Sequence, residues 1–259
     1  MRIPVRPKKS LGQNFLQDNN VVEKLIRFIV PSKEDSFIEI GAGTGVLTSR
    51  LAPLAGRVVA VEIDRSLIPF LNQIPLVEVL NEDIRKVNLQ TITKGTKLRA
   101  VGNLPYYIST SILTSLIQQR EFLQDMILMF QEEVAQRIVA PHSDSEYGLL
   151  SVLAQYYCVI DKGFRISRNC FQPKPDIESR VLRFSFRTGT LQSYEKYMKF
   201  LTQAFSQRRK KLRNNLLRNL QISPESLDSA FQKLGIAETV RAENLTPTQF
   251  DLLIQELAL

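Results

Sequence analysis

The segment Ser36–Gly45 constrains the fold more than any other part of the chain. A largely apolar run occupies its first half, and three glycines then follow at alternate positions, Gly41, Gly43 and Gly45. Because glycine has no Cβ, such a turn leaves the backbone open to a ligand at the start of the next helix. A strand, a glycine-rich turn and a helix in this order predict the first unit of a parallel α/β sheet that binds a nucleotide-like ligand.

Further apolar runs continue this alternation. They are Arg57–Ile63, Leu76–Leu80, Leu98–Gly102, Met126–Phe130 and Tyr157–Phe164. Several are apolar at successive positions, which is typical of strands buried on both faces, and helical patterns lie between most pairs. Before them, Asp18–Val30 has apolar residues at helical spacing and is followed by Pro31. Arg180–Arg187 alternates apolar and polar residues, which predicts a final strand at the edge of the sheet.

Strand signals stop after Thr188, and only helical patterns follow. These patterns cover Tyr194–Phe205, Arg208–Asn219, Pro224–Leu234 and Pro247–Leu257. A chain of 259 residues with 44% hydrophobic content can bury one large core and one small one. We therefore expect an α/β domain over residues 1–189 and a small all-helical domain over residues 190–259.

The positive charge of the chain is concentrated in two segments. Residues 1–17 contain Arg2, Arg6, Lys8 and Lys9, and residues 196–224 contain eight Lys and Arg, with no acid in either segment. These twelve cations leave 22 basic residues against 26 acidic ones elsewhere, although the whole chain has a net charge of +8. Cations without acids repel one another unless a partner neutralises them, so this pattern favours a phosphate backbone over a solvated helix face.

Two acids follow later strands and complete a predicted cofactor site. Glu62 comes 21 residues after Gly41 at the end of the next apolar run, where a carboxylate can bind two ribose hydroxyls. Both NAD and S-adenosylmethionine sites use this arrangement, but the dinucleotide fingerprint requires Gly or Ala where this chain has Val46. Asp83 follows the third run and could accept a hydrogen bond from an adenine amine, while Ile84 packs on the ring. Taken alone, Asp83 could equally be a helix cap.

The tetrapeptide Asn103-Leu104-Pro105-Tyr106 follows the fourth apolar run. An exocyclic amine on a base is a poor nucleophile because its lone pair is delocalised into the ring. An enzyme that methylates such an amine must hold it in acceptors that draw the lone pair out of the ring plane. The Asn103 side chain and the Leu104 carbonyl are candidates for these acceptors.

With this tetrapeptide, the chain resembles class I (Rossmann-like) S-adenosylmethionine-dependent methyltransferases. Three more motifs make it similar to the KsgA/RsmA family of ribosomal RNA adenine dimethyltransferases over nearly its whole length. They are Lys8–Leu16, Phe171–Ser179, which matches the family's Phe-x-Pro-x-Pro-x-Val-Asp-Ser loop, and the basic stretch Ala204–Leu216. The chain departs from the family in having Ile177 and Glu178 for Val and Asp, and Glu82-Asp-Ile84 for Gly-Asp-Ala.

The resemblance implies roles for individual residues. S-adenosylmethionine would be bound by Asn14 and Leu16 at the methionine end, Gly41 under the carboxylate or ribose, Glu62 on the ribose, Asp83 and Ile84 at the adenine, and Asn103 near the methyl group. The target adenine would be flipped out and stacked between Tyr106 and Phe171, with its 6-amino group on Asn103 and the Leu104 carbonyl and with Pro105 between them. The basic helix, with Arg208, Arg209, Lys210, Lys211 and Arg213, would contact RNA.

The activity implied is dimethylation of the 6-amino groups of two adjacent adenosines in the 3′-terminal hairpin loop of 16S ribosomal RNA, in the immature small subunit, during ribosome biogenesis. Three alternatives stay open. One is the related Erm branch, which methylates large-subunit RNA, usually has Ile where Leu104 stands and lacks the stretch Gln207–Asn215. Another is a non-catalytic ribosome-assembly or transcription factor, against which the intact Asn103 and Glu62 argue. The last is a small-molecule methyltransferase, which does not explain the basic segment.

Composition also bears on metal binding, membrane association and localisation. His142, Cys158 and Cys170 are too few and too scattered for a zinc site, a disulfide framework or a redox pair, so we expect no metal. The N-terminal segment is basic without an apolar core, and no stretch is apolar enough to span a bilayer. We therefore expect a cytoplasmic protein without a membrane partner, and a monomer.

Overall fold

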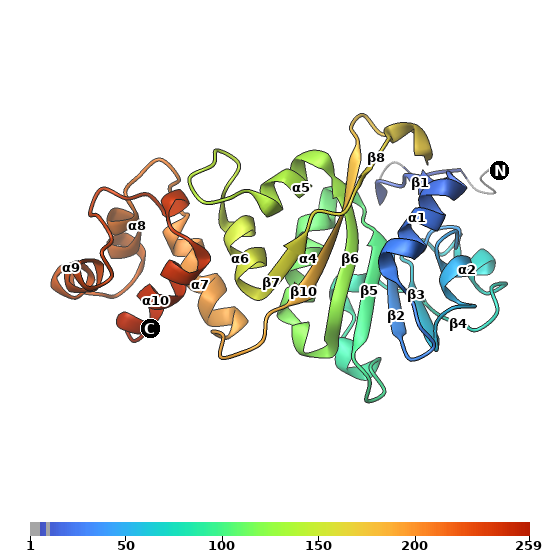
Figure 1. Cartoon of the computed structure of the whole chain (residues 1–259), viewed down its shortest axis with the longest axis horizontal. Coiled ribbons are helices and arrows are strands. Elements are labelled where there is room, and N and C mark those ends of the chain that lie inside the picture. The colour runs from blue at the N-terminus through green and yellow to red at the C-terminus, as the bar shows by residue number, and fades with distance from the viewer. Residues whose placement is uncertain (1–5, 9–10) are drawn as a thin grey trace. The chain divides into compact units, whose positions relative to one another are not determined.

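The computed structural model describes residues 6–8 and 11–259, so Arg2, Lys9 and Ser10 of the basic N-terminal segment lie outside the described residues. The chain divides into two compact units, coloured along the chain in Figure 1. The first unit runs to Ala135 and also includes Ile160–Phe186, and the second comprises Gln136–Val159 and Arg187–Leu259. The expected domain boundary near residue 190 lies close to Arg187, but the segment Gln136–Val159 groups with the helical unit.

A mixed sheet organises the first unit. Its strands in spatial order are β4 (Val77–Leu80), β3 (Arg57–Val61), β2 (Ser36–Ile40), β5 (Leu98–Asn103), β6 (Leu123–Gln131), β10 (Ser179–Phe186) and β7 (Cys158–Asp161). The strands from β4 to β6 are parallel, with Ile38 beside Val59 and Ala100, and β10 runs antiparallel to β6. The short β8 (Arg165–Ile166) also pairs with β10. The predicted α/β class is confirmed, although the sheet is parallel only from β4 to β6 and the antiparallel β10 makes it mixed.

The position of β10 in the sheet corrects one expectation. Arg180–Arg187 was predicted to form an edge strand, whereas β10 lies between β6 and β7. Two arginines of this strand are in ion pairs, Arg180 with Glu132 at 3.0 Å and Arg183 with Asp125 at 3.3 Å. Because both guanidinium groups are neutralised inside the fold, polar alternation here does not indicate solvent on one face.

The helix α1 (Asn19–Ile29) covers one face of this sheet. Asp18 caps it by accepting hydrogen bonds from the backbone of Asn20 and Val21, and its apolar stripe of Val22, Leu25, Ile26 and Ile29 is buried. This stripe belongs to the same core cluster as Phe37, Val101 and Ile127. In Figure 1, α1 lies in front of the strands and α4 (Ser109–Gln118) lies behind them. Each apolar side chain buried here contributes about 1.5 to 3 kcal/mol to folding.

The remaining elements connect the strands or build the second unit. Those of the first unit are β1 (Phe15–Leu16), which pairs with β9 (Phe171–Gln172), α2 (Thr48–Leu51), α3 (Ile68–Leu71) and the 3-10 turns η2 (Ile84–Lys86), η3 (Leu89–Thr91), η4 (Tyr106–Ile108), η5 (Arg120–Phe122) and η6 (Arg168–Cys170). Then come α5 (Glu132–Val139), α6 (Leu149–Tyr157), α7 (Tyr194–Ala204), α8 (Leu212–Asn219), α9 (Pro224–Lys233) and α10 (Pro247–Glu256). The strand expected over Tyr157–Phe164 is confined to Cys158–Asp161, because α6 continues through Tyr157.

Buried tyrosines form the core of the second unit. Tyr156 and Tyr197 stack with ring centroids 3.9 Å apart, and Tyr157 meets Tyr197 edge-on at 5.9 Å. The Tyr197 hydroxyl donates a hydrogen bond to the Pro247 carbonyl at 2.9 Å. The hydroxyl of another buried tyrosine, Tyr147, donates to the Leu245 carbonyl at the same distance. These bonds satisfy the polar ends of the rings, which would otherwise be costly to bury.

One predicted helix begins later than expected. The pattern Arg208–Asn219 indicated a helix that carries the whole basic cluster, whereas α8 starts at Leu212 and Arg208–Lys211 form the turn before it. The Leu212 amide bonds to the Val240 carbonyl at 2.8 Å, and the Asn215 side chain bonds to the Ala204 and Gln207 carbonyls at 2.8 and 3.1 Å. These contacts stabilise a non-helical turn over Arg208–Lys211, where a helical turn was expected.

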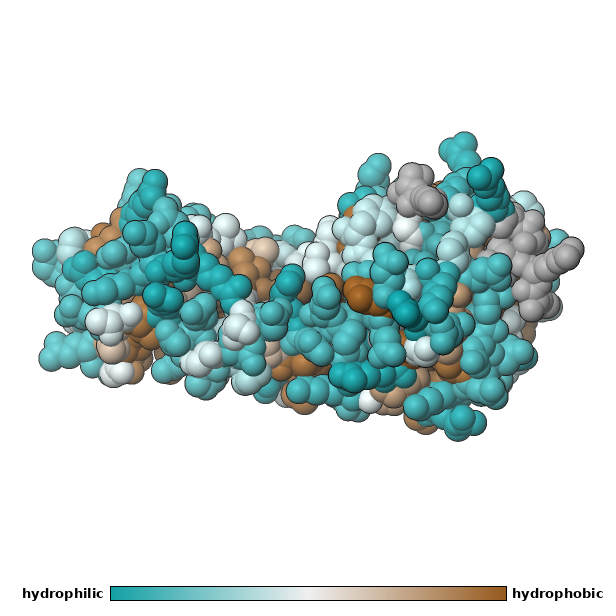
Figure 2. Space-filling view, turned by 90° about the horizontal axis from the view of Figure 1, so that it is seen from above, coloured by the Kyte–Doolittle hydropathy of each residue, from teal (hydrophilic) through white to brown (hydrophobic). Residues whose placement is uncertain are grey.

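Figure 2 shows one face of the molecule, on which hydrophilic residues predominate and hydrophobic residues form small separate patches. Within residues 6–8 and 11–259, none of the helices has both the length and the apolar character needed to cross a bilayer.

Candidate active site

The glycine-rich turn forms the floor of a pocket at the carboxyl edge of the sheet. Gly41 and Gly43 line this pocket and have φ of 67° and 60°, a left-handed conformation that side chains rarely adopt. A Cβ on Gly43 would approach the Phe15 ring to 3.2 Å, so the turn and the N-terminal segment pack closely together. A Cβ on Gly41 would make only ordinary contacts, at 3.7 Å or more, so a ligand can lie against the backbone at Gly41.

Glu62 lies at the end of β3, and both of its oxygens face backbone donors. Oε2 accepts from the Gly43 amide and Oε1 from the Asp64 amide, both at 2.9 Å. The residue is buried, and this burial raises the pKa of Glu62, against the lowering effect of the two amide hydrogen bonds. Since each carboxylate oxygen has a second lone pair, Glu62 can still accept hydroxyl hydrogen bonds from a ligand.

A second buried acid, Glu39, lies beside Glu62 in the same pocket and was assigned no role from the sequence. Burial raises the pKa of Glu39 to about 8, with the nearby Thr48 hydroxyl opposing this shift and the Glu62 charge adding to it. Its Oε2 atom is buried without a hydrogen-bond partner among the described residues. The available signal was an acid inside an otherwise apolar strand, between Ile38 and Ile40.

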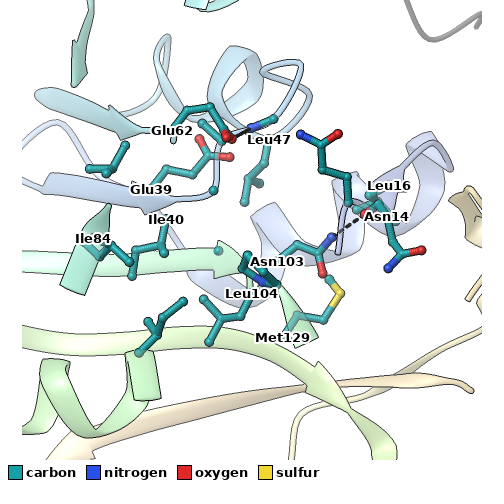
Figure 3. A pocket seen from close by; sticks show the side chains of 18 of the residues that line it. Asn14, Leu16, Glu39, Ile40, Leu47, Glu62, Ile84, Asn103, Leu104 and Met129 are labelled. Carbon is teal, nitrogen blue, oxygen red and sulfur yellow. Dashed lines mark hydrogen bonds between the residues drawn. The ribbon is translucent and has the colours of Figure 1, made fainter. Parts of the chain in front are cut away.

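Asn103 ends β5, lines the pocket and has one buried side-chain atom without a described partner. Its Nδ2 donates to the Asn14 carbonyl at 2.8 Å, as the dashed line in Figure 3 shows. Its Oδ1 is buried and has no hydrogen-bond partner in the described structure. An unsatisfied buried acceptor is costly, so this oxygen is suited to a donor that arrives with a ligand.

The rest of the tetrapeptide lines the same pocket. Leu104 is buried and Pro105 partly buried, and both line the pocket. Tyr106 begins η4, and its hydroxyl bonds to the Ser179 hydroxyl at 2.7 Å, which holds the ring in one orientation. Burial raises the pKa of Tyr106, with the Ser179 hydrogen bond opposing the shift, so this phenol stays protonated at neutral pH.

Asp83 and Ile84 lie across the pocket, but Asp83 already has a partner. Arg85 donates to its carboxylate from Nη2 at 2.5 Å and from the backbone at 3.0 Å, so Asp83 caps the turn η2. The Arg85 hydrogen bond lowers the pKa of Asp83. Any amine that binds Asp83 must therefore share the carboxylate with a guanidinium group. Ile84 is buried and lines the same pocket.

The structure therefore brings most of the predicted site residues together. The pocket is lined by Asn14, Leu16, Gly41, Glu62, Asp83, Ile84, Asn103, Leu104, Pro105 and Tyr106. Phe171 is the exception. Its side chain is only 4% exposed and belongs to the core cluster with Leu16 and Ile166, because β9 pairs with β1 in the register Leu16 to Phe171. The expectation that Phe171 faces a bound base is not met, since its ring is a packing residue here.

The five predicted RNA-binding cations belong to the second unit and fall into two groups. Arg208 pairs with Glu243 at 3.2 Å and also donates to the Ser145 carbonyl, and Arg213 pairs with Asp228 at 2.6 Å. The other three, Arg209, Lys210 and Lys211, are exposed on the turn before α8, and none of their side chains has a described hydrogen bond or ion pair. Two of the five charges are therefore already neutralised within the protein.

The described part of the chain, residues 6–8 and 11–259, contains no cluster of three His, Cys, Asp or Glu side chains placed to hold a metal ion.

Comparisons with known proteins agree on one family. The family model described as ribosomal RNA adenine dimethylase matches residues 5–259. A protein of Mycoplasma mobile named ribosomal RNA small subunit methyltransferase A is 36% identical, over 96% of this chain and 98% of its own length. Among solved structures, a dimethyladenosine transferase from Plasmodium falciparum is 25% identical with a TM-score of 0.82, over 94% of this chain and 97% of its own. The 23S rRNA methyltransferase ErmE has the same fold, at 23% identity and a TM-score of 0.69, over 95% of this chain and 100% of its own.

Proposed function

The chain belongs to the ribosomal RNA adenine dimethylase family, and from this premise we propose how its site acts and on which RNA. It is an S-adenosylmethionine-dependent ribosomal RNA adenine dimethyltransferase. Its substrate in our proposal is 16S ribosomal RNA in the immature small subunit, where it dimethylates the 6-amino groups of two adjacent adenosines in the 3′-terminal hairpin loop. The relative from Mycoplasma mobile, whose name specifies the small subunit, supports this choice over the large-subunit branch.

The pocket has groups suited to the ribose, the methionine end and the adenine of S-adenosylmethionine. Glu62 keeps lone pairs for the ribose hydroxyls, and Gly41 leaves its backbone open to the methionine end beside Asn14 and Leu16. Ile84 offers an apolar contact for the adenine ring, and Asp83 a carboxylate for its amine, which it shares with Arg85. When bound, the cofactor supplies an electrophilic methyl group on a sulfonium.

The chemistry of the protein side rests on one observation, the unpartnered Oδ1 of Asn103. We propose that this oxygen accepts a hydrogen bond from the 6-amino group of the target adenosine, with the Leu104 carbonyl as the second acceptor. Two acceptors on one amine favour a pyramidal nitrogen, whose lone pair then points away from the ring and toward the methyl donor. The neutral amine attacks without losing a proton first, so the transfer itself needs no general base. The methylated nitrogen then carries the positive charge and releases one proton to water, and correct positioning supplies most of the rate enhancement.

Tyr106 provides the remaining contact with the target base. Tyr106 follows Asn103 and Leu104 closely in the sequence and lines the same pocket, and the hydrogen bond to Ser179 fixes the orientation of its ring. In our proposal the flipped adenine stacks on this ring, while Phe171 stays in the core and supports the β1–β9 pair. The hydroxyl of Tyr106 takes no part in proton transfer.

The basic turn would bind the RNA backbone. Arg209, Lys210 and Lys211 are the exposed members of the predicted cluster, and three adjacent cations without acids suit phosphate groups. We propose that residues 190–259 serve RNA and ribosome binding, that residues 1–189 carry the catalytic site, and that the enzyme acts as a cytoplasmic monomer.

The decisive test is methylation of small ribosomal subunits that lack these modifications. The purified protein and radiolabelled S-adenosylmethionine should label adenines only in 16S RNA, and mapping should place the label in the 3′-terminal hairpin. Large ribosomal subunits treated in parallel serve as the control. Label confined to large-subunit RNA would show that the substrate assignment is wrong.

A further inference from the structure

Asp64, outside the pocket, is a buried carboxylate with an unusual set of partners. It lies two residues after Glu62 and is 3% exposed. It accepts hydrogen bonds from Lys8 Nζ at 2.6 Å and Gln13 Nε2 at 2.7 Å, as well as from the Ser66 hydroxyl at 2.7 Å. Burial would raise the pKa of Asp64, but these bonds outweigh burial and lower it. The charged Asp64 side chain is therefore hydrogen-bonded to Lys8 and Gln13, which lie 56 and 51 residues earlier in the chain.

Internal hydrogen bonds stiffen that segment. We call Lys8 together with Leu11–Asn14 the N-terminal strap. The Lys8 amide donates to Gln13 Oε1 at 2.7 Å, and the Leu11 amide donates to the Lys8 carbonyl at 3.1 Å. The Gln13 side chain thus bonds to the start of the strap with its oxygen and to Asp64 with its nitrogen. Moving Asp64 or Lys8 must displace Gln13 and the residue that follows it.

The residue after Gln13 holds the proposed catalytic amide. The Asn14 carbonyl accepts from Asn103 Nδ2 at 2.8 Å. An amide whose nitrogen is occupied in this way must present its oxygen on the other side, and Asn103 Oδ1 is the atom without a partner. The Asn14 carbonyl therefore selects which end of the Asn103 amide meets the substrate.

We propose that Asp64 is a positioning residue for the Asn103 amide, acting through the N-terminal strap. The strap is anchored at Asp64 by Lys8 and Gln13 and ends at the Asn14 carbonyl, which orients Asn103. The inference rests on the proposed function only for what Asn103 does. The anchoring of the strap at Asp64 and the orientation of the Asn103 amide do not depend on the substrate or the cofactor.

The test compares Asp64→Asn with a matched loss of charge elsewhere. Asp64→Asn keeps the size of the side chain and removes the charge that faces Lys8. Asp35→Asn is the control, because Asp35 is also largely buried and pairs with Arg99 at 2.8 Å but does not line the pocket. We expect Asp64→Asn to lower the single-turnover methylation rate at saturating RNA and cofactor by about 10- to 100-fold, since small misplacements of a reacting group have effects of this size. Asp35→Asn should keep the wild-type rate.

A spectroscopic measurement on the ligand-free protein separates positioning from folding. In protein labelled with nitrogen-15 on asparagine, Asp64→Asn should shift or broaden the side-chain amide signals of Asn103, and Asp35→Asn should leave them unchanged. Lys8→Gln should act in the same way as Asp64→Asn, and the double variant should be no worse than either single one, because both act through one anchor.

Several outcomes would overturn the proposal. Unchanged Asn103 signals together with a wild-type rate in Asp64→Asn would refute it, and so would additive effects of Asp64→Asn and Lys8→Gln. If Asp64→Asn does not fold, Lys8→Gln and Gln13→Ala give the same two readouts, because Lys8 is exposed and Gln13 only partly buried. Failure of the wild-type protein to methylate 16S RNA would instead reject the proposed function and leave the Asn103 signals informative.

Discussion

Neutralising the basic turn before α8 should change how RNA binding depends on salt. The triple variant Arg209→Gln, Lys210→Gln and Lys211→Gln removes the three exposed charges that have no described intramolecular partner. Each phosphate contact contributes about 0.7 to 0.9 to the log-log slope of affinity against salt, so the slope should become shallower by about 2 to 3. Arg208 and Arg213 should contribute less, because Glu243 and Asp228 already neutralise them.

This slope predicts a measurable change in affinity. Between about 50 and about 200 mM salt, the advantage of the wild type over the triple variant should shrink roughly 20- to 40-fold. Fluorescence anisotropy or filter binding with the small-subunit substrate at several salt concentrations measures it. The methylation rate at saturating RNA should stay near the wild-type value, because these residues belong to the second unit and the pocket to the first.

A matched control removes the same net charge elsewhere. Lys33, Lys97 and Lys162 are exposed residues of the first unit, and replacing all three with Gln should leave the slope almost unchanged. Thermal unfolding of both variants checks that neither has lost its fold. A stable basic-turn variant with the wild-type affinity and slope would show that the turn is only a solvated surface.

Three further predictions concern the pocket. Glu62→Ala should weaken S-adenosylmethionine binding by about 1.5 to 3 kcal/mol, the usual scale for hydrogen bonds to a charged group, and unchanged affinity in calorimetry would remove Glu62 from the site. Asn103→Ala should lower the single-turnover rate about 100-fold or more while RNA affinity stays near normal, and a near-normal rate would eliminate its proposed role as an acceptor. The third concerns Glu39, because burial raises its pKa from the ordinary 4.5 to about 8. Between these pH values the folded state therefore holds a proton that the unfolded state lacks. The free energy of unfolding should therefore fall with rising pH in this window, by at most about 1.4 kcal/mol per pH unit, and Glu39→Gln should flatten this dependence in chemical denaturation series. Parallel pH profiles for the two proteins would contradict the buried, protonated state.

Most of the sheet and most of the pocket could be predicted because short local sequence patterns determine both. The run Ser36–Ile40 and its glycines give a strand and a turn by composition alone, and the acid Glu62 follows at a regular distance. Carboxyl ends of parallel strands meet at one edge, so residues that follow different strands were expected to converge there.

The features that the sequence did not predict depend on tertiary partners. Arg and Lys are good helix formers, so Arg208–Lys211 looked helical, and nothing local shows that the Leu212 amide bonds to Val240. Whether the Asp83 carboxylate faces solvent or Arg85 depends on side-chain conformation. The same holds for Phe171, since an aromatic in a Pro-rich loop can face a ligand or the core, and only the pairing of β9 with β1 decides it.

The position of β10 also has a consequence for synthesis of the protein. Ribosomes release the chain from its N-terminus, so β6 and β7 both leave the exit tunnel before β10, which lies between them in the finished sheet. Until residue 186 has emerged, β6 therefore exposes the unpaired backbone groups that β10 will later bind. Nascent chains truncated before Ser179 should consequently be prone to aggregation or chaperone binding, whereas those extended past Phe186 can close the sheet. The enzyme thus depends on a ribosome delivering nearly three quarters of its chain before its own sheet is complete.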